Sequence, residues 1–98
     1  MTLLLQKPLS EETAFARYLK AGWQAFENSN YEEALALLRK AAVADLRRPE
    51  PWYCMGLIQE RQDDRKSAAY CFYMACDLNV GFQPAKQALG RLGYLNLR

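Results

Sequence analysis

The 98-residue sequence contains no histidine, and it has only three cysteines, five glycines and four prolines. Without histidine it lacks the side chain that most often acts as a general acid or base near neutral pH. It also lacks a glycine-rich phosphate loop, and no serine or cysteine stands beside an evident base. We therefore expect that the protein is not an enzyme.

Because histidine is absent, cysteine would have to supply the ligands of any site for a soft metal ion such as zinc. A structural zinc site normally needs four nitrogen or sulfur ligands, and no pair among the three cysteines has the spacing of metal ligands. Cys71 and Cys76 fall on one expected helix and point in different directions, so they cannot form a local disulfide. We expect no metal and no cofactor, and a cytoplasmic protein whose reduced thiols are buried as small apolar groups.

Neither sign of charge is in excess, because 13 basic residues accompany 11 acidic ones and the formal net charge is +2. A broad basic face for nucleic acid is therefore not expected, and we interpret the small cluster at Arg47 and Arg48 as a solvated turn. Residues 1–5 form a short apolar run that has no positive charge before it and that Gln6 and Lys7 interrupt. We expect neither a signal peptide nor membrane insertion.

The most regular feature of the sequence is a period of 34 residues, on which Gly22, Gly56 and Gly90 fall. Glycine or alanine at such positions lets two helix backbones approach closely. The same register pairs residues of similar type at other positions, namely Tyr18 with Trp52, Ala34 with Ala68, Leu38 with Phe72, Ala41 with Ala75, and Ala21 with Met55 and Leu89. A fixed period of this size predicts stacked helical hairpins.

We expect helices over residues 10–27, 31–45, 50–62 and 65–78 and a capping helix over about 83–95. Ser10 is the expected N-cap of the first helix, because its hydroxyl can accept hydrogen bonds from free backbone N–H groups. Polar residues at 28–30 and 63–64 predict the two hairpin turns. Residues 10–98 then form one domain, with repeat one at about 15–48 and repeat two at about 49–82, and residues 1–9 lie outside it.

This pattern resembles the tetratricopeptide repeat (TPR) family from about residue 15 onwards. Residues 52–56, Trp-Tyr-Cys-Met-Gly, match the opening half of the family signature, and Ala68, Phe72 and Ala75 match the closing half. Residues 31–34, Tyr-Glu-Glu-Ala, match the start of a second helix. The resemblance implies an all-α fold, a short right-handed α-solenoid of two hairpins with a C-terminal capping helix.

The sequence departs from the family pattern at a few positions. Leu46 and Val80 stand where the family usually has proline after the second helix, although Pro49, Pro51 and Pro84 follow a few residues later. Arg65 replaces the tyrosine that usually opens the second helix of a repeat. These changes weaken single contacts and leave the period intact.

In TPR proteins the first helix of each hairpin lines the concave surface that binds ligands. The resemblance places in that groove residues three or four positions apart on each helix, as one helical face requires. The expected partner-binding residues are Leu19, Trp23, Phe26, Tyr53, Leu57, Glu60, Gln87 and Arg91, with Ala16, Glu50, Pro84 and Tyr94 on the same faces. The groove is expected to be apolar and aromatic in its N-terminal half and polar towards its C-terminal half.

The composition of this groove discriminates between classes of ligand. TPR co-chaperones that hold an acidic C-terminal tail use lysine, asparagine and arginine as a carboxylate clamp. The matching positions here lack suitable donors; they are Leu19, Trp23, Cys54, Pro84 and Ala88. An apolar groove instead favours an apolar helix or extended segment, with Trp23, Phe26 and Tyr53 as the main anchors. The expected function is that of a protein-binding adaptor or assembly chaperone.

Three alternatives remain open at this point. The apolar residues 3–5 could fill the groove, so that a partner must displace the chain's own N-terminal segment. Tyr70 and Tyr73, on the outer face of the fourth helix, could form a second interface or a homodimer of a structural module. The chain is also similar to the small TPR chaperones of bacterial type III secretion, which shield hydrophobic stretches of needle or translocator subunits.

Overall fold

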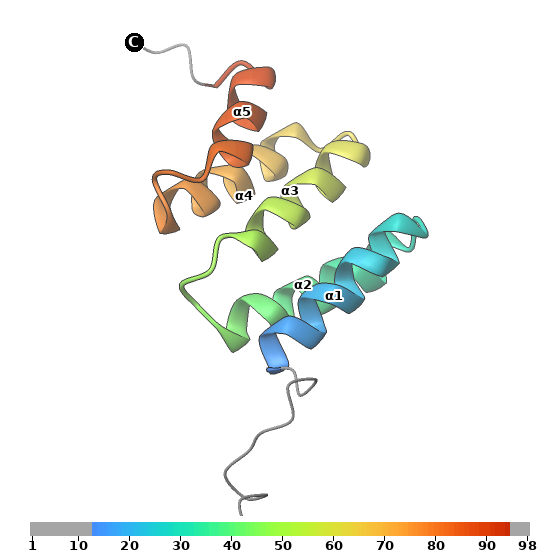
Figure 1. Ribbon diagram of the computed structural model, residues 1–98. Helices are drawn as coiled ribbons and strands as arrows, with labels where there is room; N and C mark the ends of the chain where they lie inside the picture. The colour runs from blue at the N-terminus through green and yellow to red at the C-terminus, as the bar shows by residue number, and fades with distance from the viewer. Residues whose placement is uncertain (1–12, 95–98) are drawn as a thin grey trace, which may run out of the picture.

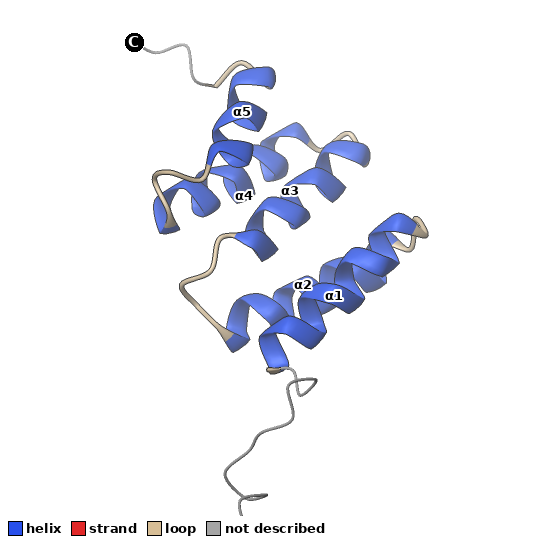
Figure 2. Cartoon of the chain, in the orientation of Figure 1, coloured by secondary structure: helices blue, strands red, loops and turns tan. Residues whose placement is uncertain are grey.

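The computed structural model describes residues 13–94 and contains five α-helices there. They are α1 (Ala14–Glu27), α2 (Tyr31–Ala44), α3 (Glu50–Arg61), α4 (Arg65–Leu78) and α5 (Gln83–Arg91) (Figure 1). No strand occurs in this part of the chain (Figure 2). α1 packs on α2 and α3 packs on α4, which makes two hairpins, while α2 contacts α3 and α4 contacts α5. The prediction of an all-α fold is confirmed.

Two of the expected helix boundaries were wrong by more than one residue, and local chemistry explains both. The first helix starts at Ala14, because the hydroxyl of Thr13 accepts a hydrogen bond of 3.1 Å from the backbone N–H of Ala16. Thr13 is therefore the N-cap in place of Ser10. The last helix ends at Arg91, before residue 95, because Gly93 adopts a φ of 87° in the left-handed region.

The 34-residue period of the sequence recurs in the packing of the hairpins. A Cβ atom added to Gly22 would lie 2.8 Å from the side chain of Leu38, and one added to Gly56 would lie 2.5 Å from the ring of Phe72. The two helices of each hairpin therefore approach so closely that only hydrogen fits between them. This close contact explains why glycine stands at both positions, although glycine weakens a helix interior by about 1 kcal/mol relative to alanine.

The same period recurs in the turns. Ser29 and Asp63 occupy equivalent positions in the two hairpins, and both adopt the left-handed conformation, with φ of 62° and 64°. The links that follow each hairpin also match. The carboxylate of Asp45 accepts from the backbone N–H of Arg47 at 3.1 Å, and the amide oxygen of Asn79 accepts from Gly81 at 2.9 Å. The fold is therefore repeat-like in its backbone geometry as well as in its sequence.

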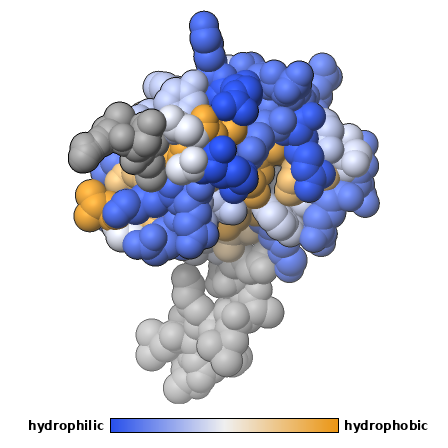
Figure 3. All heavy atoms as spheres, turned by 90° about the horizontal axis from the view of Figure 1, so that it is seen from above, coloured by the Kyte–Doolittle hydropathy of each residue, from blue (hydrophilic) through white to orange (hydrophobic). Residues whose placement is uncertain are grey.

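The core is continuous along the stack. One cluster of buried side chains joins α1, α2 and α3 and includes Cys71 of α4, and a second joins α4 and α5, while Trp52, Tyr53 and Leu57 of α3 pack against both. Leu38 and Phe72 are fully buried at its centre. Within the described residues no charged side chain is buried. Figure 3, which views the molecule from above, shows apolar side chains in small patches between hydrophilic ones.

The cysteines belong to this core as small apolar groups, with Cys54 and Cys71 in the first cluster and Cys76 against the second. Cys54 and Cys71 are buried and Cys76 is half-buried, and all three are free thiols. Burial raises the pKa of Cys54 to about 12 and that of Cys71 to about 11. The thiol of Cys71 donates a hydrogen bond of 3.0 Å to the amide oxygen of Gln59. Both thiols are therefore protonated and unreactive at neutral pH, and the expected burial is confirmed for this pair.

Polar contacts fasten the short helix α5 to the second hairpin. Arg65 donates from Nη2 to the backbone oxygen of Leu92 at 2.9 Å, so its guanidinium caps the end of α5. Arg91 forms a two-pronged ion pair with Glu60 of α3. The hydroxyl of Tyr73 lies 3.4 Å from the backbone oxygen of Tyr94. α5 thus closes the stack through contacts with both α3 and α4.

Candidate functional site

Two hollows lie along the face formed by α1 and α3, and they meet at Trp23. The first has a volume of about 780 Å³, and its lining includes Leu19, Trp23 and Tyr53. The second has a volume of about 840 Å³, and its lining includes Trp23, Leu57 and Arg61. We call the two together the α1–α3 groove. Helical spacing explains this arrangement, because Leu19 and Trp23 lie one turn apart on α1, as do Tyr53 and Leu57 on α3.

Most of the residues predicted from the TPR resemblance lie in this groove. Ala16, Leu19, Glu50 and Tyr53 line the first hollow, and Trp23 lines both. Phe26, Leu57, Glu60 and Arg91 line the second hollow. Gln87, Pro84 and Tyr94 line neither hollow, because α5 meets the groove only through its last turn.

Trp23 is the large apolar side chain that the groove exposes most. It is 37% exposed, and its ring lies 5.1 Å from the ring of Phe26 between centroids. The indole N–H donates a hydrogen bond of 2.9 Å to the carboxylate of Glu27, one turn later on α1. This bond holds the indole in one orientation while part of the side chain stays accessible, which is the arrangement of an aromatic anchor.

Phe26, predicted as one of the main anchors, lines the second hollow but is largely buried. It is only 7% exposed and belongs to the core cluster around Leu38. The guanidinium of Arg61 lies over its ring at 5.1 Å, and the ring of Tyr31 lies 6.1 Å away. Phe26 therefore forms the floor under the second hollow. A ligand there would meet Arg61 before it reached the phenyl ring.

Tyr53 is half-buried between two aromatic rings of other elements. Its ring lies 5.8 Å from Phe72 of α4 and 5.6 Å from Phe82, which precedes α5. It therefore presents part of its ring to the first hollow while the rest ties α3 to the second hairpin. A substitution at Tyr53 would disturb folding as well as any binding, which makes Trp23 the better residue for a functional test.

Two of the positively charged side chains along the groove are already engaged in ion pairs. In the first hollow Arg48 and Glu50 form a two-pronged pair at 3.1 and 3.2 Å, and these hydrogen bonds raise the pKa of Arg48. In the second hollow the pair of Arg91 with Glu60 raises the pKa of Arg91 in the same way. The second hollow also contains Glu27 and Arg61, so it is the more polar of the two, and its charges balance.

Tyr70 and Tyr73 are both exposed on α4, but they contact different parts of the molecule. Tyr70 meets the ring of Trp52 edge-on at 6.2 Å and is 59% exposed. Tyr73 meets the ring of Tyr94 edge-on at 6.4 Å, next to the end of α5. The two tyrosines therefore belong to separate surroundings, and Tyr73 also serves the attachment of α5.

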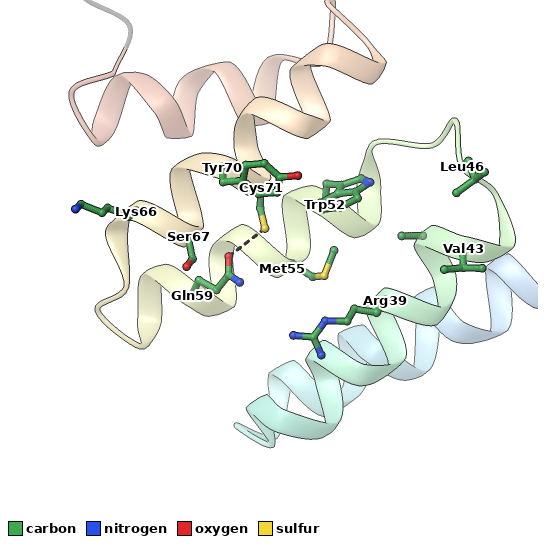
Figure 4. Close-up of a pocket in the computed structure, with 11 residues that line it drawn as sticks. Arg39, Val43, Leu46, Trp52, Met55, Gln59, Lys66, Ser67, Tyr70 and Cys71 are labelled. Carbon is green, nitrogen blue, oxygen red and sulfur yellow. Dashed lines mark hydrogen bonds between the residues drawn. The ribbon is translucent and has the colours of Figure 1, made fainter.

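The sequence interpretation missed a third hollow, which lies on the opposite side of α3. Its volume is about 580 Å³, and α2 and α4 form its walls while α3 forms its floor (Figure 4). We call it the α2–α4 hollow. Its lining comprises Arg39, Ala42, Val43, Leu46, Trp52, Met55, Gln59, Lys66, Ser67, Tyr70 and Cys71. One signal could have revealed it: Val43 and Leu46 are apolar at positions of α2 and the following turn that the repeat leaves facing water.

Two further observations restrict what kind of site the chain carries. Among the described residues, no group of three or more acidic, cysteine or histidine side chains is placed to hold a metal ion. Within the same residues, no helix has the length and apolar character that crossing a bilayer requires. The prediction that residues 3–5 fill the groove falls outside the described part of the chain. No protein-family model matches the sequence, and no curated protein matches it either.

Proposed function

We propose that the protein is a TPR-type adaptor or assembly chaperone that holds an apolar segment of another protein in the α1–α3 groove. The observation that carries this proposal is the meeting of two hollows at Trp23, an accessible indole fixed by its hydrogen bond to Glu27. An indole in such a position is the commonest kind of interface anchor. A short TPR α-solenoid agrees with the 34-residue recurrence of glycine contacts and turns.

The residues of the groove favour a ligand segment in which one large apolar side chain is followed by polar groups. The first hollow offers Leu19, Tyr53 and Phe82 around Trp23, whereas the second offers Arg61 and Glu27. An apolar helix or extended segment would place its largest side chain against Trp23 and let polar groups continue past Arg61. Shielding such a segment is the task of the type III secretion chaperones that the sequence resembles, which makes a chaperone the more specific form of this proposal.

The decisive experiment compares the wild type with Trp23→Ala in affinity capture from the native cell lysate, followed by titration of the purified client. Val80→Ala is the matched control, because Val80 is 79% exposed and lines neither hollow of the groove. We expect the client to be retained by the wild type and Val80→Ala, and Trp23→Ala to weaken its binding about 30-fold or more, as an anchor worth 2 kcal/mol implies. Circular dichroism should show equal helix content in all three proteins. Equal capture by Trp23→Ala would refute the proposal.

A self-associating structural module is the second candidate, and one observation favours it. Gly90 is the third glycine of the 34-residue series, yet a Cβ atom added there would meet nothing within 4 Å. The face of α5 that corresponds to the packed faces at Gly22 and Gly56 is therefore open within the described residues. Sedimentation equilibrium should then show a dimer that Gly90→Arg dissociates, whereas a monomer at all concentrations excludes this candidate.

A further inference from the structure

The α2–α4 hollow has a consistent polarity from one end to the other. Each wall carries a cation followed one turn later by an apolar or aromatic side chain, Arg39 then Val43 on α2 and Lys66 then Tyr70 on α4. The floor repeats this order, with Gln59 at the polar end, Met55 in the middle and Trp52 at the apolar end (Figure 4). Three helices therefore agree on which end of the hollow is polar.

The polar end of the hollow carries two positively charged side chains, Arg39 and Lys66. Arg39 and Lys66 are both exposed, and neither forms an ion pair with a described residue. Among the described side chains that line the hollow, none is a carboxylate. The cations of the α1–α3 groove differ in this respect, because Arg48 and Arg91 are paired with Glu50 and Glu60. The hollow is thus complementary to a ligand that is negative at one end.

The apolar end is too open for a small ligand to be its natural occupant. Met55 and Cys71 are buried at the floor, but Val43 and Leu46 at the rim are 73% and 71% exposed. A molecule confined to the hollow would leave these rim side chains in water. A further hollow, of about 410 Å³, adjoins the α2–α4 hollow along α2 and shares Arg39 and Val43 with it. Its described lining adds Lys40 and contains no carboxylate. The two hollows therefore form one surface that continues across α2, and a protein segment is long enough to cover it.

We propose that the α2–α4 hollow binds an amphipathic helix of a partner protein that carries acidic residues at one end. From Arg39 to Val43 the surface spans one turn of α2, roughly 6 Å at 1.5 Å per residue, and Leu46 in the turn beyond the helix extends it towards the length of about two turns of a docked helix. Apolar anchors three and four positions apart would contact Trp52, Val43 and Leu46. An aspartate or glutamate one turn before them would reach Arg39 and Lys66. This site is separate from the α1–α3 groove and does not depend on its proposed function.

The test uses Trp52 as the reporter, because the chain has two tryptophans and Trp23→Phe leaves Trp52 alone. The probes are two alanine-based helical peptides without aromatic residues. Both carry leucines at i, i+3 and i+7, and one carries glutamates one turn before the first leucine where the other carries lysines. We expect saturable quenching or shift of Trp52 emission by the glutamate peptide, and about tenfold weaker binding of the lysine peptide, a difference that falls as salt is raised.

Charge reversal makes the test specific to the hollow. Arg39→Glu with Lys66→Glu should reverse the preference, so that the lysine peptide binds more tightly than the glutamate peptide. The control, Arg47→Glu with Lys86→Glu, makes the same change of net charge at exposed residues outside the hollow and should leave the preference unchanged. Val43→Asp should abolish the signal, with circular dichroism confirming the fold. Trp23→Ala should not affect binding measured by peptide anisotropy, which separates this site from the groove.

Three results would overturn the proposal. They are the absence of a saturable change in Trp52 emission, equal binding of the two peptides, and equal effects of the two charge-reversal variants. A concentration-dependent dimer that Val43→Asp dissociates would assign the hollow to a second copy of the chain instead.

Discussion

The two hairpins have the same turns and the same glycine contacts, but they differ in how completely they are enclosed. Leu38 lies under Gly22 in the first hairpin, whereas the larger Phe72 lies under Gly56 in the second. The second hairpin is covered by α2 on one side and α5 on the other, while within the described residues the first has a neighbour on one side only. We infer that stability is concentrated in the second hairpin, which leaves Trp23 on the first free to serve recognition.

The largest expected effect comes from emptying the centre of the second hairpin. Phe72→Ala should cost about 3–5 kcal/mol in the free energy of unfolding, because Phe72 is fully buried and contacts Gly56 and Tyr53. Leu38→Ala, at the equivalent position of the first hairpin, should cost about 2–4 kcal/mol. Urea denaturation measures both, with an unchanged m-value as the control for two-state unfolding. A larger cost at Leu38 would place the stable centre in the first hairpin.

Alkaline pH should affect the second hairpin selectively, because Cys54 and Cys71 both lie in it. Their pKa values in the fold are about 12 and 11, against 9.0 for an unperturbed thiol. The thiols of the unfolded chain therefore lose their protons at lower pH than those of the folded protein. The stabilisation that the two protonated thiols contribute is complete below pH 9.0 and is lost as the pH rises towards their pKa values in the fold. Each thiol should reduce stability by up to about 1.4 kcal/mol per pH unit in that window.

The measurement is urea denaturation between pH 8 and about pH 11 for the wild type and for Cys54→Ala with Cys71→Ala. The double variant should lose some stability at pH 8 but should show a clearly shallower decline above pH 9. The other ionisable groups are the same in both proteins, so their contributions cancel in the comparison. Parallel curves for the two proteins would show that the thiols ionise freely in the fold.

The three glycines of the 34-residue series should respond to alanine in three different ways. Gly56→Ala should destabilise by about 1–2 kcal/mol, since overpacking against Phe72 exceeds the gain in helix propensity. Gly22→Ala should cost somewhat less, because its closest contacts, with Cγ and Cδ2 of Leu38, lie at 2.8 Å rather than 2.5 Å. Gly90→Ala should stabilise by about 0.5–1 kcal/mol, since its added methyl group meets nothing.

The midpoints of thermal unfolding of the three variants measure this order of stability directly. The variants serve as controls for one another, because each makes the same chemical change at an equivalent position. A destabilising Gly90→Ala would mean that α5 packs against something at that face, such as a second copy of the chain. In that event the self-association candidate would gain support.

The periodic part of the fold could be predicted from the sequence, and the parts that depend on single contacts could not. The bounds of α4 and the starts of α2 and α3 agree with expectation, because turn residues and the 34-residue register define them. The end of α5 was wrong, because it depends on Gly93 and on the long-range bond from Arg65 to Leu92. Phe26 lines the second hollow, but its burial under Arg61 depends on a residue of another helix. The α2–α4 hollow needs three helices, so no single helical face predicts it.

The smallest expected effects lie in the turns, where the two hairpins are most alike. Ser29 and Asp63 both hold a positive φ, which costs an L-residue roughly 1–2 kcal/mol unless its side chain compensates. Aspartate tolerates this conformation better than serine does. Ser29→Gly should therefore stabilise by about 0.5–1 kcal/mol, and Asp63→Gly by a few tenths at most. Differential scanning calorimetry of both variants resolves this difference, with Gln24→Gly on the exposed face of α1 as a control that should destabilise. A larger gain at Asp63 than at Ser29 would mean that the second turn stores the greater strain, and the stability of the second hairpin would then come from its packing in spite of its turn.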